Sequence, residues 1–580
     1  MDAPALPGRR MLALGVMMLS PALHAQLSPD QQEQRDRAQR EARARQAQQD
    51  APDVRLDTPA SLYHWRQVTL PIEATCHRLE VITLEGEHVR AFAFAQRYLN
   101  RYRGRCVGSE GLNLIVRRVS DLVVERGYVT TRIGVLPQAS SGGTLKLALA
   151  AGTIHAVRVA GPESARGQSD NSDPHASDPH AAVAGDWRFA LPVRPGDLLN
   201  LRDIEQAVEQ FKRLSSQDVS IDIAPTDEPG ASDLMISVAR TRPWSAVVSL
   251  DDSGAPATGR RQGGLNGTFD NMLGINDVLN LGVSRSVPRL ATAGTRGWNG
   301  YYSVPWGKWT ASTSLSDYRY QQQVGGFQQS FLSSGKSRTA DLTLQRLVHR
   351  DSRGKTAIEF RLGKRWAHSF IEDVEIGSQR RNVTHGEVAL VQRQYLGHAQ
   401  VDLRLAHRHG LTWLGGQGDA KGHRRHDPSF TYAVNTLDVS VAAPFRVGAL
   451  PLQWSSEYRM QRSSRPLYGS EFITLGGRYT VRGFNGEHTL AGDRGWYWRN
   501  TLSLPWGSLP MASYVGLDTG HIGGPGAYGL ARKSLRGTVV GVRGSVQRLN
   551  IDAFFGRPIA GAGAVLARAV TSGFQVSYML

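Results

Sequence analysis

Two neighbouring segments, Asp341-Leu-Thr-Leu-Gln345 and Thr356-Ala-Ile-Glu-Phe-Arg-Leu362, carry the pattern that decides the fold. Apolar and polar residues alternate in both, and the polar turn Asp351-Ser-Arg-Gly-Lys355 separates them. Successive side chains of a β-strand point to opposite faces, so Leu, Ile and Phe share one face while Asp, Thr, Glu and Arg share the other. The sequence therefore predicts an antiparallel hairpin with one apolar and one charged face.

The same period of two recurs from Trp244 to Leu580, in short segments separated by turns rich in Gly, Asp, Asn and Pro. Clear examples are Leu279-Asn-Leu-Gly-Val283, Val401-Asp-Leu-Arg-Leu405 and Leu437-Asp-Val-Ser-Val441. A soluble β-sandwich also alternates, but charges at one parity over so long a region favour a water-filled lumen surrounded by lipid. We predict a transmembrane antiparallel β-barrel of about 16 strands over residues 243–580.

The composition agrees with a membrane barrel. Mean hydropathy is −0.33, and only 40% of residues are hydrophobic, yet the chain has 62 Gly, 17 Tyr, 16 Phe and 12 Trp. No run beyond the N-terminal segment approaches the roughly 18 to 20 apolar residues of a membrane-spanning helix, which excludes a helical membrane protein. In an exported chain, the net charge of +17 lines a pore or faces anionic lipid. We expect outer-membrane lipid, and no nucleic acid, among the partners.

Residues 1–25 have the features of a secretory signal peptide. Arg9 and Arg10 form the positive region, residues 11–19 the apolar region, and Ala25 precedes the expected cleavage site. Because export leads to an oxidising compartment, the two cysteines, Cys76 and Cys106, are expected to form a structural disulfide worth about 3 to 4 kcal/mol. Two cysteines alone do not indicate a metal site.

Residues 26–50 favour a helix without an apolar face. Ser28 is a suitable N-cap, and from Gln31 to Gln49 alanine is the only apolar residue type. Such a segment is either a solvated arm or a helix inside a wet lumen, where about 20 residues would span about 30 Å. The second reading makes it a plug helix. Residues 51–70, rich in Pro and charge, are predicted to be a linker.

Two small α+β modules are predicted between the linker and the barrel, at residues 71–152 and 153–242. The first has the order β-α-α-β-β, with Leu79, Val81 and Leu84 expected to face inward from its first strand; the elements are 77–86, 89–102, 109–126, 129–136 and 144–150. The second repeats the pattern with a strand, a helix and two strands at 154–159, 201–214, 219–223 and 234–238. An inserted segment, 163–185, holds a tandem Ser-Asp-Pro-His-Ala repeat and favours a flexible loop over a metal site.

Sequence motifs for catalysis are missing. The chain has no H-E-x-x-H, G-x-S-x-G or Walker motif. Its G-x-G-x-x-G, from Gly524 to Gly529, contains Pro525 and lacks the strand-turn-helix context of a nucleotide site. His423-Arg-Arg-His-Asp427 is predicted to be an exposed loop. We therefore expect no enzyme activity, no catalytic residues, no cofactor and no metal.

The segment Leu475-Gly-Gly-Arg-Tyr-Thr-Val-Arg-Gly-Phe484 resembles the L-G-G-x-x-x-V-R-G-[FY] signature of two-partner secretion transporters in the barrel-assembly superfamily. Shorter resemblances extend over most of the chain; they are Gly127–Arg132, Leu199–Gln206, Asp251–Gly254 and Val515–Gly520. The resemblance implies two polypeptide-transport-associated (POTRA) domains, a sixteen-stranded barrel and an N-terminal helix that plugs the pore.

The resemblance also implies a site. Val481, Arg482, Gly483 and Phe484 would form the tip of a long loop folded back into the barrel, against a partner on the barrel wall. In Tyr514–Gly520, alternation places Tyr514, Gly516, Asp518 and Gly520 on the lumen face. Asp518 is the expected partner of Arg482, with Gly520 beside it.

The resulting functional hypothesis is an outer-membrane pore of the haemolysin secretion/activation type. Its periplasmic POTRA domains would bind a large secreted exoprotein of the haemolysin, adhesin or contact-dependent toxin type, and its barrel would carry that protein to the cell surface. One alternative is a barrel insertase of the same superfamily. Another is a porin or receptor for small solutes, although two folded modules would then have no obvious role.

Overall fold

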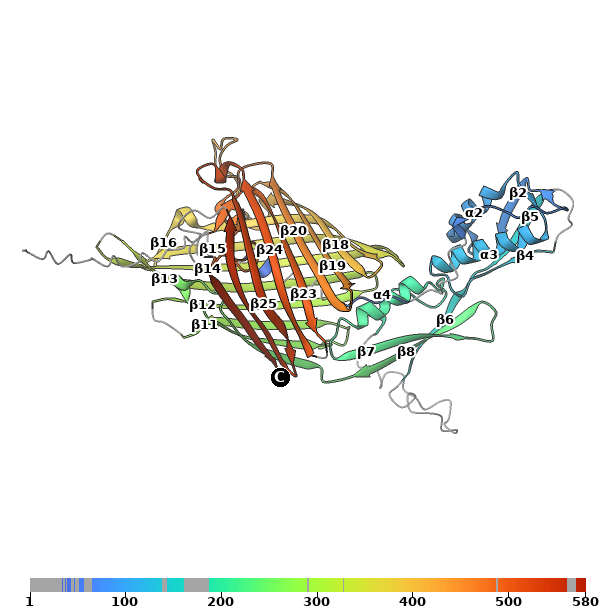
Figure 1. The fold of residues 1–580 in the computed structure, drawn as a ribbon, viewed down its shortest axis with the longest axis horizontal. Coiled ribbons are helices and arrows are strands. Elements are labelled where there is room, and N and C mark those ends of the chain that lie inside the picture. The colour runs from blue at the N-terminus through green and yellow to red at the C-terminus, as the bar shows by residue number, and fades with distance from the viewer. Residues whose placement is uncertain are drawn as a thin grey trace, which may run out of the picture.

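A large barrel and an arm of two small modules make up the molecule in the computed structural model (Figure 1). The described residues are 34, 37, 39–42, 46, 52–56, 65–137, 143–160, 187–288, 292–326, 328–486, 489–507, 509–560 and 570–580. The expected signal peptide and the inserted segment 163–185 lie outside them. Within the described residues, no helix combines the length and apolar character needed to cross a bilayer.

The first module packs two helices on a three-stranded sheet. Its elements are β1 (His77–Arg78), β2 (Val81–Glu85), η2 (Val89–Phe92), α2 (Ala93–Leu99), η3 (Asn100–Tyr102), β3 (Cys106–Val107), α3 (Ser109–Glu125), β4 (Arg132–Val135) and β5 (Thr144–Ala150). β2 is parallel to the central strand β5, and β4 is antiparallel to it. The α3 stripe Ile115, Val119 and Val123 is buried in the core against this sheet, at the predicted helical spacing.

One inward-facing assignment was wrong. Leu79 is buried, but Val81 is 37% exposed, whereas Ile82 and Leu84 are 1% and 5% exposed. β1 ends at Arg78 and β2 begins only at Val81, so the alternation restarts between the two strands. A single run of period two across 77–86 therefore gives the wrong parity.

Two contacts fasten the start of the first module, one to β3 and one to the N-terminus of α3. Cys76 and Cys106 form a disulfide with Cα atoms 5.3 Å apart. The Glu73 carboxylate accepts hydrogen bonds from the backbone N–H groups of Gly108, Glu110 and Gly111 at 2.8–3.0 Å. Those groups belong to the first turn of α3, where backbone donors lack helical partners.

The second module has one α-helix over a three-stranded sheet. Its elements are β6 (Thr153–Ala160), η4 (Trp187–Phe189), α4 (Leu201–Phe211), β7 (Gln217–Pro225) and β8 (Ala231–Arg240). Asn200 caps α4 by accepting a 2.8 Å hydrogen bond from the backbone N–H of Arg202. The sheet order is β6-β8-β7, and Ile204 and Phe211 from α4 lie in the core above it.

Sixteen antiparallel strands close the barrel. They are β9 (Trp244–Asp251), β10 (Gln262–Asp270), β11 (Val278–Ser286), β12 (Gly294–Trp306), β13 (Trp309–Gly325), β14 (Ser330–Asp351), β15 (Gly354–Ile371), β17 (Arg381–Leu396), β18 (Ala399–Leu411), β19 (Ala433–Val447), β20 (Leu450–Ser463), β23 (Arg494–Trp506), β24 (Leu509–Gly523), β25 (Ser534–Val546), β26 (Leu549–Ala560) and β27 (Thr571–Met579). The short β16 (Val374–Glu375) adds to the end of β15, and β27 pairs with β9 to complete the ring.

The hairpin of β14 and β15 has the predicted apolar and charged faces. β14 pairs with β15 around the turn at Asp351–Gly354, and Leu342, Leu344 and Phe360 are exposed on the outer surface. On the opposite face, Arg361 bonds to Asp341 at 3.1 Å. An apolar exterior and a charged interior are what a membrane barrel with a wet lumen requires.

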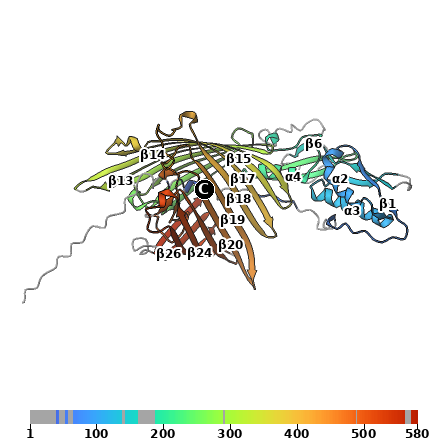
Figure 2. The ribbon, with the colours of Figure 1, turned by 90° about the horizontal axis from the view of Figure 1, so that it is seen from above.

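The second module contacts one end of the barrel, hereafter the module end. Gly307, in the turn between β12 and β13, donates its N–H to Phe189 O at 2.8 Å. Figure 2, seen from above, shows the same arrangement, with the modules extending away from the barrel. The opposite end, hereafter the distal end, carries the longer connections between strands.

Candidate functional site

A cavity inside the barrel is lined mainly by polar and charged residues of the strands. Beyond the strands, Pro52 and the connection between β9 and β10 also line it, and so do three further segments: the segment between β20 and β23, described residues of the N-terminal segment, and residues of α4. The candidate site is this lumen together with the three segments that occupy or border it.

The connection between β20 and β23, residues 464–493, is called the lumen loop. It contains η8 (Gly469–Glu471) and a small hairpin of β21 (Ile473–Leu475) and β22 (Leu490–Gly492). Arg478 lies in the connection between β21 and β22 and contacts the barrel where β27 meets β9. Its Nη2 donates to Phe574 O on β27 at 3.0 Å, and its Nη1 lies 3.6 Å from Asp252, which follows β9.

The tip of the lumen loop places Arg482 against Asp518 on β24. The Nε and Nη2 atoms of Arg482 each lie 2.7 Å from a different carboxylate oxygen, and its backbone N–H donates to Asp518 Oδ2 at 2.9 Å. Nη2 also donates to Thr501 Oγ1 at 2.9 Å. Asp518 is only 1% exposed, so the wall carboxylate is fully covered by the loop.

Glycines let the loop backbone approach the wall at this point. Gly483 has φ +96°, a conformation that favours glycine, and a Cβ there would lie 2.7 Å from Arg557 O. On the wall, a Cβ at Gly537 would lie 1.9 Å from Arg482 O, and one at Gly556 would lie 2.8 Å from the Cα of Gly483. Side chains at these wall positions would push the tip away.

The other predicted tip residues pack around this contact. Val481 and Phe484 are buried in an apolar cluster with Leu475, and the wall residue Gly520 lies under it. A Cβ at Gly520 would approach Leu475 Cδ2 to 2.9 Å. The structure thus brings Val481, Arg482, Gly483 and Phe484 together with Asp518 and Gly520.

The described residues of the N-terminal segment are helical and contact the lumen loop. Arg37 donates to Ser470 O at 2.7 Å and to Phe472 O at 2.6 Å. Gln34 Nε2 donates to Gly469 O at 2.6 Å. On the wall, Arg459 of β20 lies 2.9 Å from Glu41. These contacts are polar, as expected for a helix with no apolar face.

A network of lumen charges supports both inserted segments. Glu471 in the lumen loop accepts a 2.6 Å hydrogen bond from Arg365 of β15 and also faces Arg37 at 3.4 Å. Arg408 of β18 lies 3.8 Å from Glu471 and donates to Glu387 of β17 at 2.7 Å. The loop and the N-terminal segment therefore meet the wall through one shared set of ion pairs.

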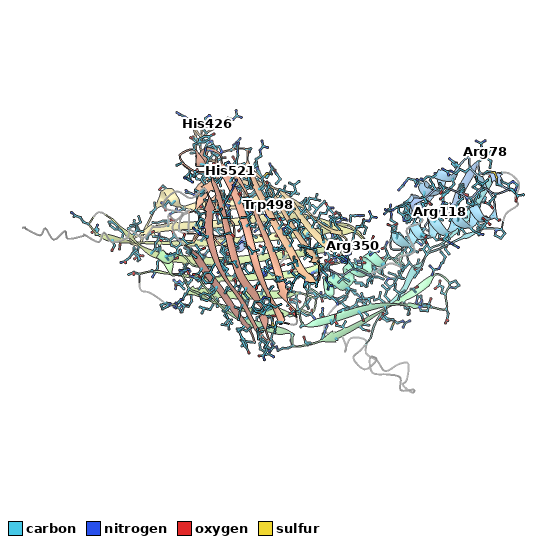
Figure 3. The ribbon with its side chains drawn as sticks, in the orientation of Figure 1. Arg78, Arg118, Arg350, His426, Trp498 and His521 are labelled. Carbon is cyan, nitrogen blue, oxygen red and sulfur yellow. A yellow bond between two sulfur atoms is a disulfide. The ribbon has the colours of Figure 1, made fainter. Side chains whose placement is uncertain are left out.

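A second buried cluster joins α4 to the module end of the barrel. Arg350, labelled in Figure 3, donates to Glu205 at 3.1 Å and to Glu209 at 2.7 Å, both on α4. Its Nη2 bonds to Val54 O in the described part of the linker, and Lys355 pairs with Glu209. The side chains of Arg350 and Glu205 are 5% and 1% exposed. The linker is also held by a 2.9 Å hydrogen bond from the Leu56 N–H to Glu205 and by contacts of Asp53 with Tyr395 and Lys355, so linker, helix and barrel meet in one cluster.

The sequence did not single out several of these residues. Glu471 and Arg350 were missed because their partners come from other strands or modules. Glu205 lies inside Leu199–Gln206, a segment that had been noted only for its resemblance. Two loop predictions are confirmed. His426 is exposed in a loop at the distal end (Figure 3). Gly524–Gly529 connects β24 to β25 and contains only the short η9 (Pro525–Ala527).

A closed barrel with a polar lumen, an inward-folded loop and two α+β modules at one end defines an outer-membrane transporter with periplasmic POTRA domains. The chain belongs to the haemolysin secretion/activation protein family of the ShlB/FhaC/HecB type, whose family model matches residues 230–544. A ShlB-type POTRA domain matches residues 77–152, and a further POTRA domain matches residues 153–225. The module end is therefore periplasmic and the distal end extracellular.

Several relatives are similar over most of the chain. The outer membrane transporter CdiB-2 of Burkholderia pseudomallei is 36% identical over 567 residues, which cover 94% of this chain and 93% of that protein. The hemolysin transporter protein ShlB of Serratia marcescens is 25% identical over 525 residues, covering 87% and 88%. The solved structure of CdiB from Escherichia coli superposes with a TM-score of 0.80 at 25% identity, covering 96% of this chain and all of that one (100%). These relatives are transporters of two-partner secretion.

Proposed function

We propose that the barrel exports one large secreted partner protein from the periplasm to the cell surface. The observation that carries this proposal is the polar cavity inside the barrel, occupied by segments held through ion pairs and hydrogen bonds. The polar contacts of the N-terminal segment can be exchanged for water, so this segment can leave the lumen without exposing a large apolar surface. A passenger of the haemolysin, adhesin or contact-dependent toxin type fits the family.

The proposed division of labour follows the chain. After a signal peptide (1–25), residues 26–50 plug the lumen, residues 51–70 link the plug to the arm, residues 71–152 and 153–242 form the two POTRA domains, and residues 243–580 form the pore. Arg482 and Asp518 hold the lumen loop in the resting position. The disulfide between Cys76 and Cys106 stabilises the first POTRA domain.

The POTRA domains are proposed to capture the partner while it is unfolded. β4 and β7 each lie at an edge of a three-stranded sheet. An extended segment can add to such an edge through backbone hydrogen bonds, which supply affinity while demanding little of the sequence. In this way a single transporter can hold a long, unfolded passenger at the periplasmic entrance.

Secretion in cells tests the proposal directly. The chain would be expressed with a candidate partner, namely any large, repeat-rich exported protein that an adjacent gene encodes, and that exoprotein would be measured in the medium, on the cell surface and in the periplasm. We expect surface or released exoprotein only when the transporter is present. Periplasmic retention despite a folded barrel, or loss of other barrels from the outer membrane, would favour the insertase alternative instead.

A further inference from the structure

A row of four cations crosses the outside of the barrel near its extracellular end. Arg285 on β11 is paired with Arg296 on β12, Arg296 with Arg319 on β13, and Arg319 with Lys336 on β14. Each pair consists of residues directly opposite each other on neighbouring strands, which lie side by side in Figure 1. These four residues are called the cation row; at strand spacings of about 4.8 Å it is about 14 Å long.

The cation row faces away from the lumen. Arg285 has the parity of Leu281 and Val283, and Arg319 has that of Leu315, all three of which are exposed apolar residues of the outer surface. Residues of the opposite parity on the same strands, such as Ser284 and Tyr318, carry polar groups, as expected for a lumen face. The row therefore projects outward, toward the surrounding membrane.

The depth of the cation row matches the outer headgroup region. β13 starts at Trp309 on the periplasmic side, and Arg319 follows ten residues later. With a rise of about 3.3 Å per residue and the usual strand tilt, Arg319 lies about 25 Å further along the membrane normal, the height of the apolar band of an outer-membrane barrel. The exposed Trp298 and Leu342 lie on the periplasmic side of the cation row, within the apolar band.

The row carries an unbalanced positive charge. Like charges directly opposite each other on a sheet destabilise it. Asp317 is the carboxylate of this exterior patch, and it is shared by Arg319 at 3.0 Å and Arg338 at 2.7 Å. Among the described residues, no ion pair involves Arg285, Arg296 or Lys336. On β15, the residue opposite Lys336 is His368. His368 contacts Glu375, and Arg380 forms an ion pair with the same carboxylate.

We propose that the cation row binds the phosphate groups of a phosphorylated glycolipid in the outer leaflet. Arginine binds phosphate through two parallel donors, and lysine adds a point charge. Phosphates would neutralise the row from outside, while the acyl chains of the same lipid would lie against the apolar surface around Trp298 and Leu342. The proposal rests on the outer-membrane position of the barrel and is independent of the proposed secretion.

Binding of lipid A to the purified full-length protein tests the row. The protein in non-ionic detergent would be titrated with bisphosphorylated lipid A, with dephosphorylated lipid A and with inorganic pyrophosphate, and bound molecules would be counted by native mass spectrometry. The test variant replaces Arg285, Arg296 and Lys336 with Gln. We expect bisphosphorylated lipid A to bind the unmodified protein at least about tenfold more tightly than the variant, since each basic residue near an anionic surface adds to affinity.

A matched control removes the same charge elsewhere. Arg346, Arg446 and Arg548 are exposed at the periplasmic end, and their replacement with Gln should leave binding unchanged. A charge-preserving variant, R285K with R296K, should keep most of the affinity. Heat-modifiable gel mobility verifies that each barrel is folded. Equal binding by the unmodified protein and the test variant, equal binding of dephosphorylated lipid A, or binding of pyrophosphate alone would overturn the proposal. None of these readouts depends on a passenger.

Discussion

Arg482 reaches Asp518 through a planar fork of two side-chain donors and its own backbone N–H. Lysine cannot reproduce this geometry, since it has one terminal nitrogen. Both side chains are shielded, at 11% and 0% exposure. A shielded ion pair contributes less to stability than its Coulomb attraction suggests, because both charges lose water. Removing one partner, however, leaves an uncompensated charge. At the residue scale, the pair therefore acts as a specific clasp between loop and wall.

Breaking the clasp on either side should impair secretion. Arg482→Ala and Asp518→Ala should each weaken the loop-to-wall contact by about 3 to 5 kcal/mol, and the double variant should lose much less than the sum. Arg482→Lys should restore secretion only in part. Secreted exoprotein is the measurement, with Arg543→Ala as the control for a lumen arginine outside the clasp. Losses that simply add would remove the pair from the mechanism.

Glu73 gives a pH-dependent contact outside the membrane. Partial burial raises the pKa of its carboxyl. The hydrogen bonds from three backbone N–H groups at the start of α3 lower the pKa by more, so that it falls below the ordinary value of 4.5. Because the folded-state pKa is the lower one, the stabilisation is complete above pH 4.5 and is lost as the pH falls through the folded-state pKa.

Hydrogen exchange of the full-length protein measures this loss. Corrected for the intrinsic pH dependence, exchange at Gly108–Gly111 should accelerate below pH 4.5 in the unmodified protein. Glu73→Gln should exchange faster at neutral pH and show little further change on acidification. The exposed Glu80, changed to Gln, is the matched control. The same acid response in Glu73→Gln as in the unmodified protein would show that another group is responsible.

At the element scale, α4 is the contact between the arm and the pore. Its face toward the barrel carries Glu205, Glu209 and Asp203, which meet Arg350, Lys355 and Lys308 of two periplasmic turns. The same Arg350 also holds the linker at Val54. A partner that shifts the second POTRA domain would therefore pull on the segment leading to the plug. The linker and α4 form one mechanical unit because they share a buried cation.

Arg350→Ala should release this unit. Glu205 keeps its ion pair with Arg202 and the hydrogen bond from the Leu56 N–H, so losing the charged hydrogen bond from Arg350 should cost about 1.5 to 3 kcal/mol of interface stability. We expect faster hydrogen exchange in α4 and protease cleavage within residues 52–56, while the barrel itself stays folded. Arg353→Ala, in the same turn but exposed, should change neither. Unchanged protection of the linker in Arg350→Ala would mean that Arg350 does not hold it.

On the scale of the whole molecule, the barrel lumen is occupied by segments that are held through polar contacts and through the apolar cluster around Leu475 and Phe484. The N-terminal segment touches the loop and wall through Gln34, Arg37 and Glu41, and the loop touches the wall through Arg478, Arg482 and Glu471. Each of these groups can be solvated by water once it leaves its partner. A lumen occupied in this way is expected to open without local unfolding of the barrel.

Deleting residues 26–50 of the chain should therefore increase conductance. Single-channel recordings in planar bilayers should show a larger and longer-lived open state than the intact protein, because the described helical residues of this segment line the cavity. Arg37→Ala should increase the open time without the full rise in conductance. Arg346→Ala, on the outside of the barrel, is the control. Conductance of the deletion no greater than that of the intact protein would discard the plug.

The sequence by itself determined the membrane barrel, its lumen face and the α+β arm. These features follow from local periodicity: a period of two assigns Asp341 and Asp518 to the lumen, and helical spacing assigns Ile115 and Val119 to a core. The limit of local periodicity is seen at Val81, where a break between two short strands reversed the parity. The role of Arg482 at the loop tip was predicted from the resemblance of its segment to a family signature, and periodicity alone does not predict it.

Only the tertiary structure decided which charges meet. Arg350 and Glu205 are 145 positions apart, and Arg37 and Ser470 are 433 apart, so no local pattern could pair them. The cation row depends on the register of four strands, and a shift of one residue in any of them would turn its cation into the lumen. Strand register, set by the closure of the whole barrel, therefore placed both the ion pairs inside and the unpaired cations outside.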